Sequence, residues 1–349
     1  MKIRHLLLAC LSILVINGQS QELGEFKPKA YGSAKKFRKM PKKLYVANFN
    51  VQIEIYKEAV DKKAAGGFRN TITNAAKAKA AVGISSLDKE AIQATVDQLY
   101  NEFIADFKAK GFEIISADEA GKTKVYENWK RAEGPFIRET FMPGILSACP
   151  SNFSFYYKDK NAFSKIAAGF SKTNTNLSDQ LEDALIADVN LVFAFTELGQ
   201  VLVKGSGAKV KMFIDYRLEN SYTFSNERTD AGITAAFDKT KQTQQLSSKV
   251  EFTQGKLPIG GSPEAQYTGT TKKPIPINGV LAREKVTAYS KQTSATATSI
   301  NPVVVIKGSN YSEVTKWLEP NPELYAKGMY MAGKKLVDFH TNELLNVYK

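Results

Sequence analysis

Histidine and cysteine, on which many nucleophilic and acid–base sites depend, are nearly missing from this 349-residue chain, which contains two of each. His5 and Cys10 lie in an N-terminal segment that we expect to be removed, which leaves His340 and Cys149. A Ser-His-Asp or Cys-His site would have to use His340. That residue falls among apolar residues at helical spacing and is interpreted as packing. Cys149 is interpreted as a small buried residue, so no catalytic residue is predicted.

No pattern in the sequence indicates a metal ion or a cofactor. With one cysteine and one histidine left, a zinc site would need at least two carboxylates, and no spacing indicates them. The segment Gly205-Ser206-Gly207 is followed by Val210, where a dinucleotide-binding loop has its third glycine. We interpret this segment as a hairpin turn between two strands. No metal site and no cofactor are therefore predicted.

Carboxylates are the remaining residues that could do chemistry, because Asp and Glu alone suffice for glycoside hydrolysis. Glu54, Asp215 and Glu219 lie on or beside predicted strands. Strand alternation makes each of them more simply a solvent-facing residue, and it also places Lys211 and Arg217 outward. A carboxylate-dependent hydrolase stays an alternative, because a sequence does not reveal which carboxylates converge.

Residues 129–157 are rich in aromatic side chains and contain three prolines, which prevent any long regular element. Such side chains can stack on glycans, anchor a protein partner, or pack a long loop onto a sheet. Packing is the simplest interpretation, and the other two make this segment a candidate partner or glycan contact. The candidate contact residues are Phe141, Phe153, Phe155, Tyr156 and Tyr157.

The chain is basic, with a formal net charge of +13, and residues 27–43 contain no acidic residue. A stretch of this kind repels itself and is expected to stay extended. We predict a basic linker over residues 21–43 that is able to lie on an anionic surface. The candidate surface contacts are Lys35, Lys36, Arg38, Lys39, Lys42 and Lys43.

Residues 1–20 have the composition of a secretory signal peptide. A short basic end precedes an apolar run over residues 6–16, which is too short to span a bilayer. Gly18 and Ser20 are the small residues expected before cleavage at Gln21. The one remaining cysteine cannot form an internal disulfide, which favours a bacterial envelope over a eukaryotic secretory pathway. We expect an exported protein of the periplasm, the outer-membrane periphery or the extracellular space.

The periodicity of apolar residues predicts an α+β fold, with a mixed sheet, amphipathic helices packed on it, and a β-rich polar C-terminal half closed by a terminal helix. Residues 57–83 are interpreted as an insertion with a weak helix or hairpin. The expected domains are residues 44–219 and 220–349, with one continuous domain as the alternative. Strands are predicted over residues 44–56, 112–115, 189–196, 210–218, 284–289 and 303–307, and helices over 88–110, 177–186 and 323–346.

Three short motifs accompany this order of elements. They are Val46-Ala47-Asn48-Phe49 in the first strand, Gly111-Phe112-Glu113-Ile114 after the long helix, and Ala187-Asp188-Val189 at the entry to the next strand. In these motifs and in the order of its elements, the segment 44–218 resembles the periplasmic α/β domain of the curli-secretion-channel family. The resemblance implies a non-enzymatic envelope protein that binds partners or assembles.

The sequence thus favours a non-enzymatic, exported bacterial envelope protein that acts by binding, assembly or structure. Its expected partner is an envelope protein or an anionic envelope surface. A homo-oligomer is also consistent with this role, and nucleic acid is not an expected partner of an exported chain. No later segment has the apolar length of a membrane-spanning helix, so no integral span is expected. A glycan- or ligand-binding surface adhesin and the hydrolase remain alternatives.

Overall fold

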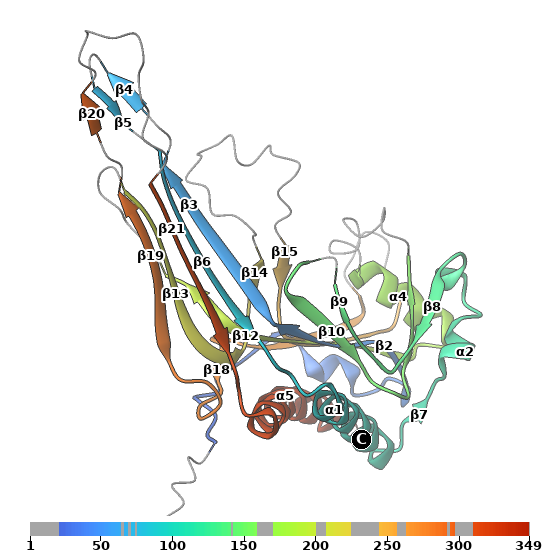
Figure 1. Cartoon of the computed structure of the whole chain (residues 1–349). Coiled ribbons are helices and arrows are strands. Elements are labelled where there is room, and N and C mark those ends of the chain that lie inside the picture. The colour runs from blue at the N-terminus through green and yellow to red at the C-terminus, as the bar shows by residue number, and fades with distance from the viewer. Residues whose placement is uncertain are drawn as a thin grey trace, which may run out of the picture.

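The computed structural model describes residues 21–63, 66–68, 71–73, 75–140, 142–158, 170–199, 207–224, 244–256, 263–291, 294–296 and 310–348. The expected signal peptide, residues 1–20, lies outside these ranges. Strands and helices combine in a mixed arrangement, so the predicted α+β class is confirmed. Figure 1 shows two parts, a broad sheet with helices on it and a long projection of strands. We name them the base and the arm.

The base sheet is built around two parallel strands, β2 (Lys43–Glu54) and β12 (Leu185–Leu198). The order of its main path is β1-β17-β16-β12-β2-β10-β9, and β7, β13, β18 and β19 pair off this path. Because the parallel pair is central, both of its faces are covered, which suits its nearly continuous apolar sequence. The other strands are β1 (Pro28–Gly32), β7 (Glu113–Ile114), β9 (Phe136–Glu139), β10 (Ile145–Cys149), β13 (Gly207–Leu218), β16 (Lys249–Gln254), β17 (Ala265–Thr271), β18 (Ile275–Pro276) and β19 (Glu284–Lys291).

β2 carries a bulge that the sequence pattern did not predict. Its register with β12 passes directly from Val46 to Asn48, so Ala47 has no direct partner. An extra residue of this kind reverses which side chains face each side of the sheet. As a result Phe49 lies in the main core, while Tyr45, which has the same parity in the sequence, lies in a second cluster.

Two long helices cover one face of the base sheet. They are α1 (Lys89–Ala109) and α5 (Pro322–Leu345), which pack side by side (Figure 1). The side chain of Asp88 caps the start of α1, and Asn321 caps the start of α5. Gly111 follows α1 with a φ of +82°, which a glycine adopts without strain. Both helices were predicted within about two residues of their observed bounds.

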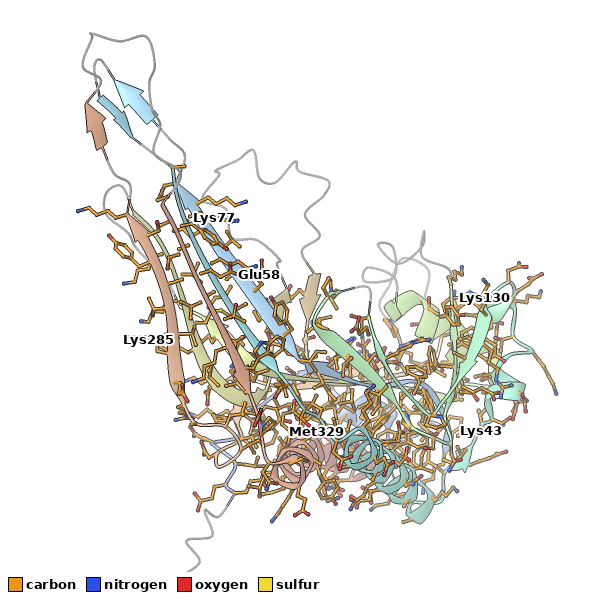
Figure 2. All side chains as sticks on the ribbon, viewed as in Figure 1. Lys43, Glu58, Lys77, Lys130, Lys285 and Met329 are labelled. Atoms are coloured by element: carbon orange, nitrogen blue, oxygen red, sulfur yellow. The ribbon has the colours of Figure 1, made fainter. Side chains whose placement is uncertain are left out.

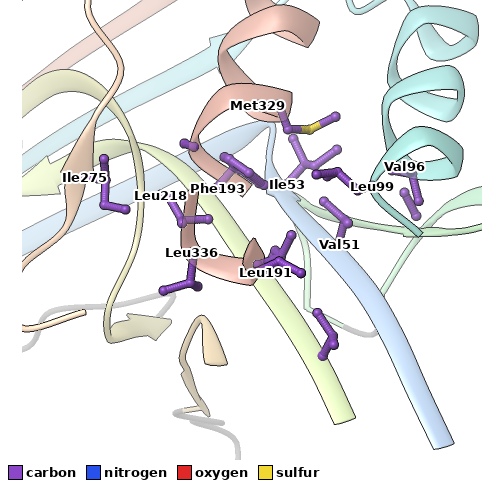
Figure 3. Packing of buried hydrophobic residues seen from close by; sticks show 14 of the residues in the cluster. Val51, Ile53, Val96, Leu99, Leu191, Phe193, Leu218, Ile275, Met329 and Leu336 are labelled. Carbon is purple, nitrogen blue, oxygen red and sulfur yellow. The ribbon is translucent and has the colours of Figure 1, made fainter. Parts of the chain in front are cut away.

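The core between these helices and the sheet is rich in aromatic rings. The ring of Phe103 in α1 lies 5.9 Å from that of Phe49 and 6.4 Å from that of Phe252, measured between centroids. Figure 3 shows the aliphatic part of the same core, where Met329 of α5 lies near Ile53 and Phe193 of the sheet. Large side chains therefore set the spacing between the two layers of the base.

Smaller elements cover the other face and the rim of the base. A second apolar cluster forms where α4 packs on β12 and on η2. The remaining elements of the base are α2 (Ala117–Ala120), α4 (Phe170–Gln180), η1 (Ala34–Phe37), η2 (Lys124–Tyr126), the ribbon of β8 (Lys130–Glu133) with β11 (Ser154–Tyr157), and the pair of β14 (Tyr222–Phe224) with β15 (Gln244–Leu246).

The arm consists of two layers of strands (Figure 1). One layer is a sheet in the order β21-β6-β3, built from β3 (Tyr56–Lys63), β6 (Ala76–Ile84) and β21 (Asn310–Leu318). The other layer is β19 with the first part of β13, residues 207–214. The short strands β4 (Gly66–Phe68), β5 (Thr71–Thr73) and β20 (Ser294–Thr296) form a small sheet at the tip.

Alanine dominates the interior of the arm. The inward positions of β6 are Ala76, Ala78, Ala80 and Val82, which are all buried and face β13 and β19. Ala59 of β3 lies in register with Ala80. Side chains this small bring the two layers close together and leave little apolar volume between them.

Several expectations about organisation are wrong. Residues 21–43 are no extended linker, because β1 pairs with β17 and Phe37 of η1 is fully buried. For residues 57–83 the helix alternative is wrong and the hairpin alternative is confirmed, because β3 and β6 pair as two long antiparallel strands of the arm. The helix expected over residues 177–186 ends at Gln180, and β12 begins at Leu185. Both expected domains contribute strands to one sheet, as β12 pairs with both β2 and β16, so the one-domain alternative describes the base.

Among the described residues, no helix combines the length and the apolar character needed to cross a membrane.

Candidate functional site

The basic segment lies folded on the base. Lys35, Lys36, Arg38 and Lys39 are exposed around η1, while Lys42 and Lys43 are half-buried. Lys43 forms an ion pair with Glu182. Phe37 anchors the turn, with its ring centroid 6.4 Å from that of Tyr348. The repulsion between these charges is therefore offset by burial of one aromatic ring, which the count of charges alone did not indicate.

The aromatic segment packs the β8–β11 ribbon onto the base. The buried ring of Phe153 lies 5.4 Å from that of Tyr100 in α1. Tyr156 stacks on Tyr126 at 4.2 Å, and its hydroxyl donates to the carbonyl of Ala117. Half-buried Phe155 and Tyr157 continue this row of rings. Phe141 lies outside the described residues.

Cys149 and His340 are buried in separate places. Burial raises the pKa of the Cys149 thiol to about 12. The Nε2 of His340 lies 2.8 Å from the carbonyl of Thr270, and its Nδ1 lies 2.7 Å from the hydroxyl of Tyr267. Because a carbonyl only accepts, we assign the proton to Nε2, and burial lowers the pKa of this histidine. Cys149 is on β10 and His340 contacts β17, four strand spacings away, which is about 19 Å.

Glu54, expected to face solvent, is only 1% exposed. Its Oε2 accepts hydrogen bonds from the backbone N–H groups of Phe195 at 2.8 Å and Thr196 at 2.9 Å. Its Oε1 accepts from the hydroxyl of Thr196 at 2.7 Å and from the hydroxyl of Tyr222. The pairing of β2 with β12 ends at Phe193, so this carboxylate binds N–H groups of β12 just beyond the last paired strand residues.

Arg217, also expected to point outward, is buried beside Glu54. Its Nε lies 2.6 Å from an oxygen of Glu219, and its Nη2 donates to the carbonyl of Thr196 at 2.8 Å. Burial raises the pKa of Glu219, although Arg217 acts in the opposite direction. Lys57 is buried as well, with its ammonium 4.9 Å from the ring centroid of Tyr222, and burial lowers its pKa.

We name these residues the joint cluster, because they come from the strands at which the arm leaves the base. The cluster consists of Glu54, Lys57, Thr196, Arg217, Glu219 and Tyr222.

The joint cluster thus brings together two of the three candidate carboxylates, Glu54 and Glu219. Glu54 is occupied by four donors and Glu219 by Arg217, and both are closed off from solvent. Asp215, the third candidate, is half-buried and pairs with Arg283 at 2.9 Å. This arrangement fixes strands to one another and presents neither buried carboxylate to a substrate. Within the described residues, no three His, Cys, Asp or Glu converge as metal ligands.

The outer face of the β21-β6-β3 sheet carries exposed aromatic rings and three charged side chains that pair with one another. Trp317 is 58% exposed and lies over Gly83, where a Cβ would come within 2.3 Å of the indole. Four residues before Gly83 on β6, Lys79 pairs with Glu58 at 3.2 Å and with Glu313 at 3.1 Å. Hydrogen bonds to these two carboxylates raise the pKa of Lys79. The charges on this face therefore largely cancel.

The arm also presents strand edges. Within the described residues, β3 and β21 each pair only with β6, and β19 pairs only with β13. Five large apolar side chains are exposed in the part of the chain that the structure describes: Tyr289, Tyr311 and Trp317 lie on the arm, and Tyr31 and Phe339 lie on the base. Unpaired strand edges with aromatic side chains beside them are features of a surface that binds another chain.

Sequence reasoning missed the joint cluster and, apart from the hairpin of β3 and β6, the arm. The alternation Ala76, Ala78, Ala80 and Val82 was a signal for a half-buried strand. Because alanine and lysine also favour helices, the sequence leaves a weak helix and a hairpin open here, and the structure confirms the hairpin. Nothing in the sequence pattern marked Glu54 as buried, because its partners lie more than 140 residues away.

Comparison with known proteins gives no relative: no family model, no curated protein and no solved structure matches this chain.

Proposed function

We propose that this chain is a non-enzymatic, exported protein of the bacterial envelope that works by binding or assembly, and that the arm is the element that contacts its partner. The observation that carries this proposal is the presence of strand edges and exposed aromatic rings together on the arm. The partner is an envelope protein or a second copy of this chain. The base serves as the scaffold from which the arm projects.

The contents of the base support a scaffold role. Its aromatic segment is engaged in packing, its one described histidine and its cysteine are buried apart, and Glu54 and Glu219 are closed within the joint cluster. A scaffold needs such buried polar groups to be fully hydrogen-bonded, which rigidifies the connection between its parts. The joint cluster gives this rigidity to the place where the arm begins.

The test compares two sets of exposed aromatic residues in the full chain. Tyr289→Ala/Tyr311→Ala/Trp317→Ala removes those of the arm, and Tyr31→Ala/Phe339→Ala removes those of the base. The wild type, produced at native level in its own host, is expected to migrate as a complex larger than a monomer in native electrophoresis of the envelope. The arm variant should migrate as a monomer with an unchanged melting curve, and the base variant should keep the complex.

Two outcomes would contradict the proposal. One is a wild type that stays monomeric in the envelope, and retention on host glycans would then favour the adhesin. The other is a loss of the complex in the base variant with full retention in the arm variant, which would place the partner on the base.

A further inference from the structure

The outer face of the β13–β19 layer, which we name the basic face, carries lysines and aromatic residues on two neighbouring strands. The register places Lys209 beside Tyr289 and Phe213 beside Lys285. The ammonium of Lys211 lies 4.4 Å from the ring centroid of Phe213. Side chains on one face of a strand recur about every 6.8 Å, so the charges form an extended row. The basic face consists of Lys209, Lys211, Phe213, Lys285, Tyr289 and Lys291.

Three lysines of the basic face form no ion pair within the described part of the chain. No carboxylate there lies within ion-pair distance of Lys209, Lys211 or Lys285. Glu284 at the edge of this layer pairs instead with Lys316 of the other layer. Glu197 lies opposite Phe213 at the base end of the face.

The two outer faces of the arm therefore differ in charge although both carry lysines. On one face Lys79 is held between Glu58 and Glu313, and on the other face three lysines have no such partner. Figure 2 shows Lys285 on one side of the arm and Glu58 and Lys77 on the other. A row of like charges on adjacent strands destabilises the sheet unless counter-charges are supplied. The counter-charges for the basic face thus have to come from ions or from a bound partner.

We propose that the basic face binds the anionic headgroups of a lipid surface. Its charged residues are all lysines, whose hydrated point charges suit a diffuse anionic surface, whereas arginine suits bidentate recognition of a single group. Tyr289, exposed among these lysines, is of the type that concentrates at the membrane–water interface. This inference rests on the proposed binding role of the arm and names the partner class for one of its faces.

The test measures binding of the purified full chain to vesicles of phosphatidylglycerol and phosphatidylcholine by co-sedimentation at low and high salt. In this experiment the arm variant is Lys209→Gln/Lys211→Gln/Lys285→Gln, which is distinct from the aromatic arm variant described above. The matched control, which is the base variant in this experiment, is Lys35→Gln/Lys36→Gln/Lys39→Gln. It removes the same charge from exposed positions of the base. Each lysine near an anionic bilayer changes the affinity about fivefold, so the arm variant should bind about 100-fold more weakly.

The expected result is salt-sensitive binding to anionic vesicles that falls in the arm variant and changes only a few-fold in the base variant. Equal or larger loss in the base variant would overturn the inference and assign the contact to the η1 segment. Equal binding to phosphatidylcholine, or binding to inorganic polyphosphate and not to vesicles, would also overturn it. If vesicle binding fails while the aromatic arm variant still loses its complex in the envelope, this inference falls and the proposed function stands.

Discussion

The base and the arm are both made of long strands, but their interiors are filled in different ways. In the base, the rings of Phe49, Phe103 and Phe252 separate sheet from helices. In the arm, alanines let two layers of strands approach closely. Large rings bury more apolar area per residue, and so the base is expected to supply most of the stability. The arm resembles an extension held in shape mainly by backbone pairing and by its connection to the base.

The charged groups at the joint and on the arm also differ, both in burial and in pairing. At the joint, charged groups are buried and fully engaged, as with Glu54 and Arg217. On the arm, the charged groups are at the surface, and Lys209, Lys211 and Lys285 of the basic face have no carboxylate partner among the described residues. Buried polar groups in this molecule hold strands together, while exposed polar groups are available to a partner. Four sets of substitutions test this division.

The largest effect is expected in the core of the base. Phe103→Ala removes a ring that packs against Phe49, Phe107 and Phe252, and it should lower the free energy of unfolding by about 4 kcal/mol. Val82→Ala, at a buried position of the arm, should cost about 2 kcal/mol, because fewer carbons are removed. Urea denaturation followed by far-ultraviolet circular dichroism measures both. Equal losses would contradict the difference in packing between the two parts.

The joint cluster gives the next effect. Glu54→Ala leaves four buried donors without an acceptor and should lower the free energy of unfolding by about 3 kcal/mol. Glu54→Gln keeps an acceptor and should lose less. Glu58→Ala is the matched control, since Glu58 lies four residues further along the chain, on β3, and is half-exposed. A loss in the control as large as that in Glu54→Ala would show that the joint has no special role.

Overpacking the interior of the arm should cost less again. Ala80→Leu inserts three carbons where Ala59 and Ala80 meet in register, which should lower the free energy of unfolding by about 2 kcal/mol. Thr315→Leu on the exposed outer face is the control. The near-ultraviolet signal of the base aromatics should stay unchanged in both variants. If Ala80→Leu is tolerated like Thr315→Leu, the layers are not closely packed.

The smallest effect is a pH dependence from His340. Its pKa is lowered in the folded chain, whereas an unfolded histidine titrates near pH 6.5. Between these two values the unfolded state binds more protons, so stability falls as the pH drops below about 6.5. The slope should be at most about 1.4 kcal/mol per pH unit. The contribution of His340 is measured by denaturing the wild type and His340→Gln at pH values from 7.5 to 5. If the free energy of unfolding of the two proteins changes in parallel with pH, the assignment of a neutral, buried ring is contradicted.

Much of the base could be predicted from sequence, because its elements follow one strong period each. The stripe of α1, its cap at Asp88 and the stop at Gly111 are local signals. The bulge at Ala47 could not be predicted from the sequence, because it depends on the partner strand β12. The linker prediction failed because a run of like charge was weighed without Phe37, whose burial fixes the segment.

The joint could not be predicted from the sequence, and of the arm only the hairpin of β3 and β6 was among the expected alternatives, for a physical reason. Alanine and lysine satisfy helix and strand patterns alike, so only the pairing of β6 with β3 and β21 decides its conformation. The burial of Glu54 depends on donors from Phe195, Thr196 and Tyr222, which are brought together by the fold and not by spacing. Sequence alternation correctly placed its neighbours on β2 and could not supply these partners.

The central claim is that the arm, and not the base, contacts the partner. Site-specific photo-crosslinking identifies which part contacts the partner. A photoreactive phenylalanine is placed singly at Tyr289, Tyr311 or Trp317 on the arm, and at Tyr31 or Phe339 on the base. With the full chain exported in its own host, we expect one discrete protein adduct from Tyr311 and from Trp317, a lipid adduct from Tyr289 on the basic face, and no adduct from the base positions. Adducts of the same mass from the base positions alone would contradict it.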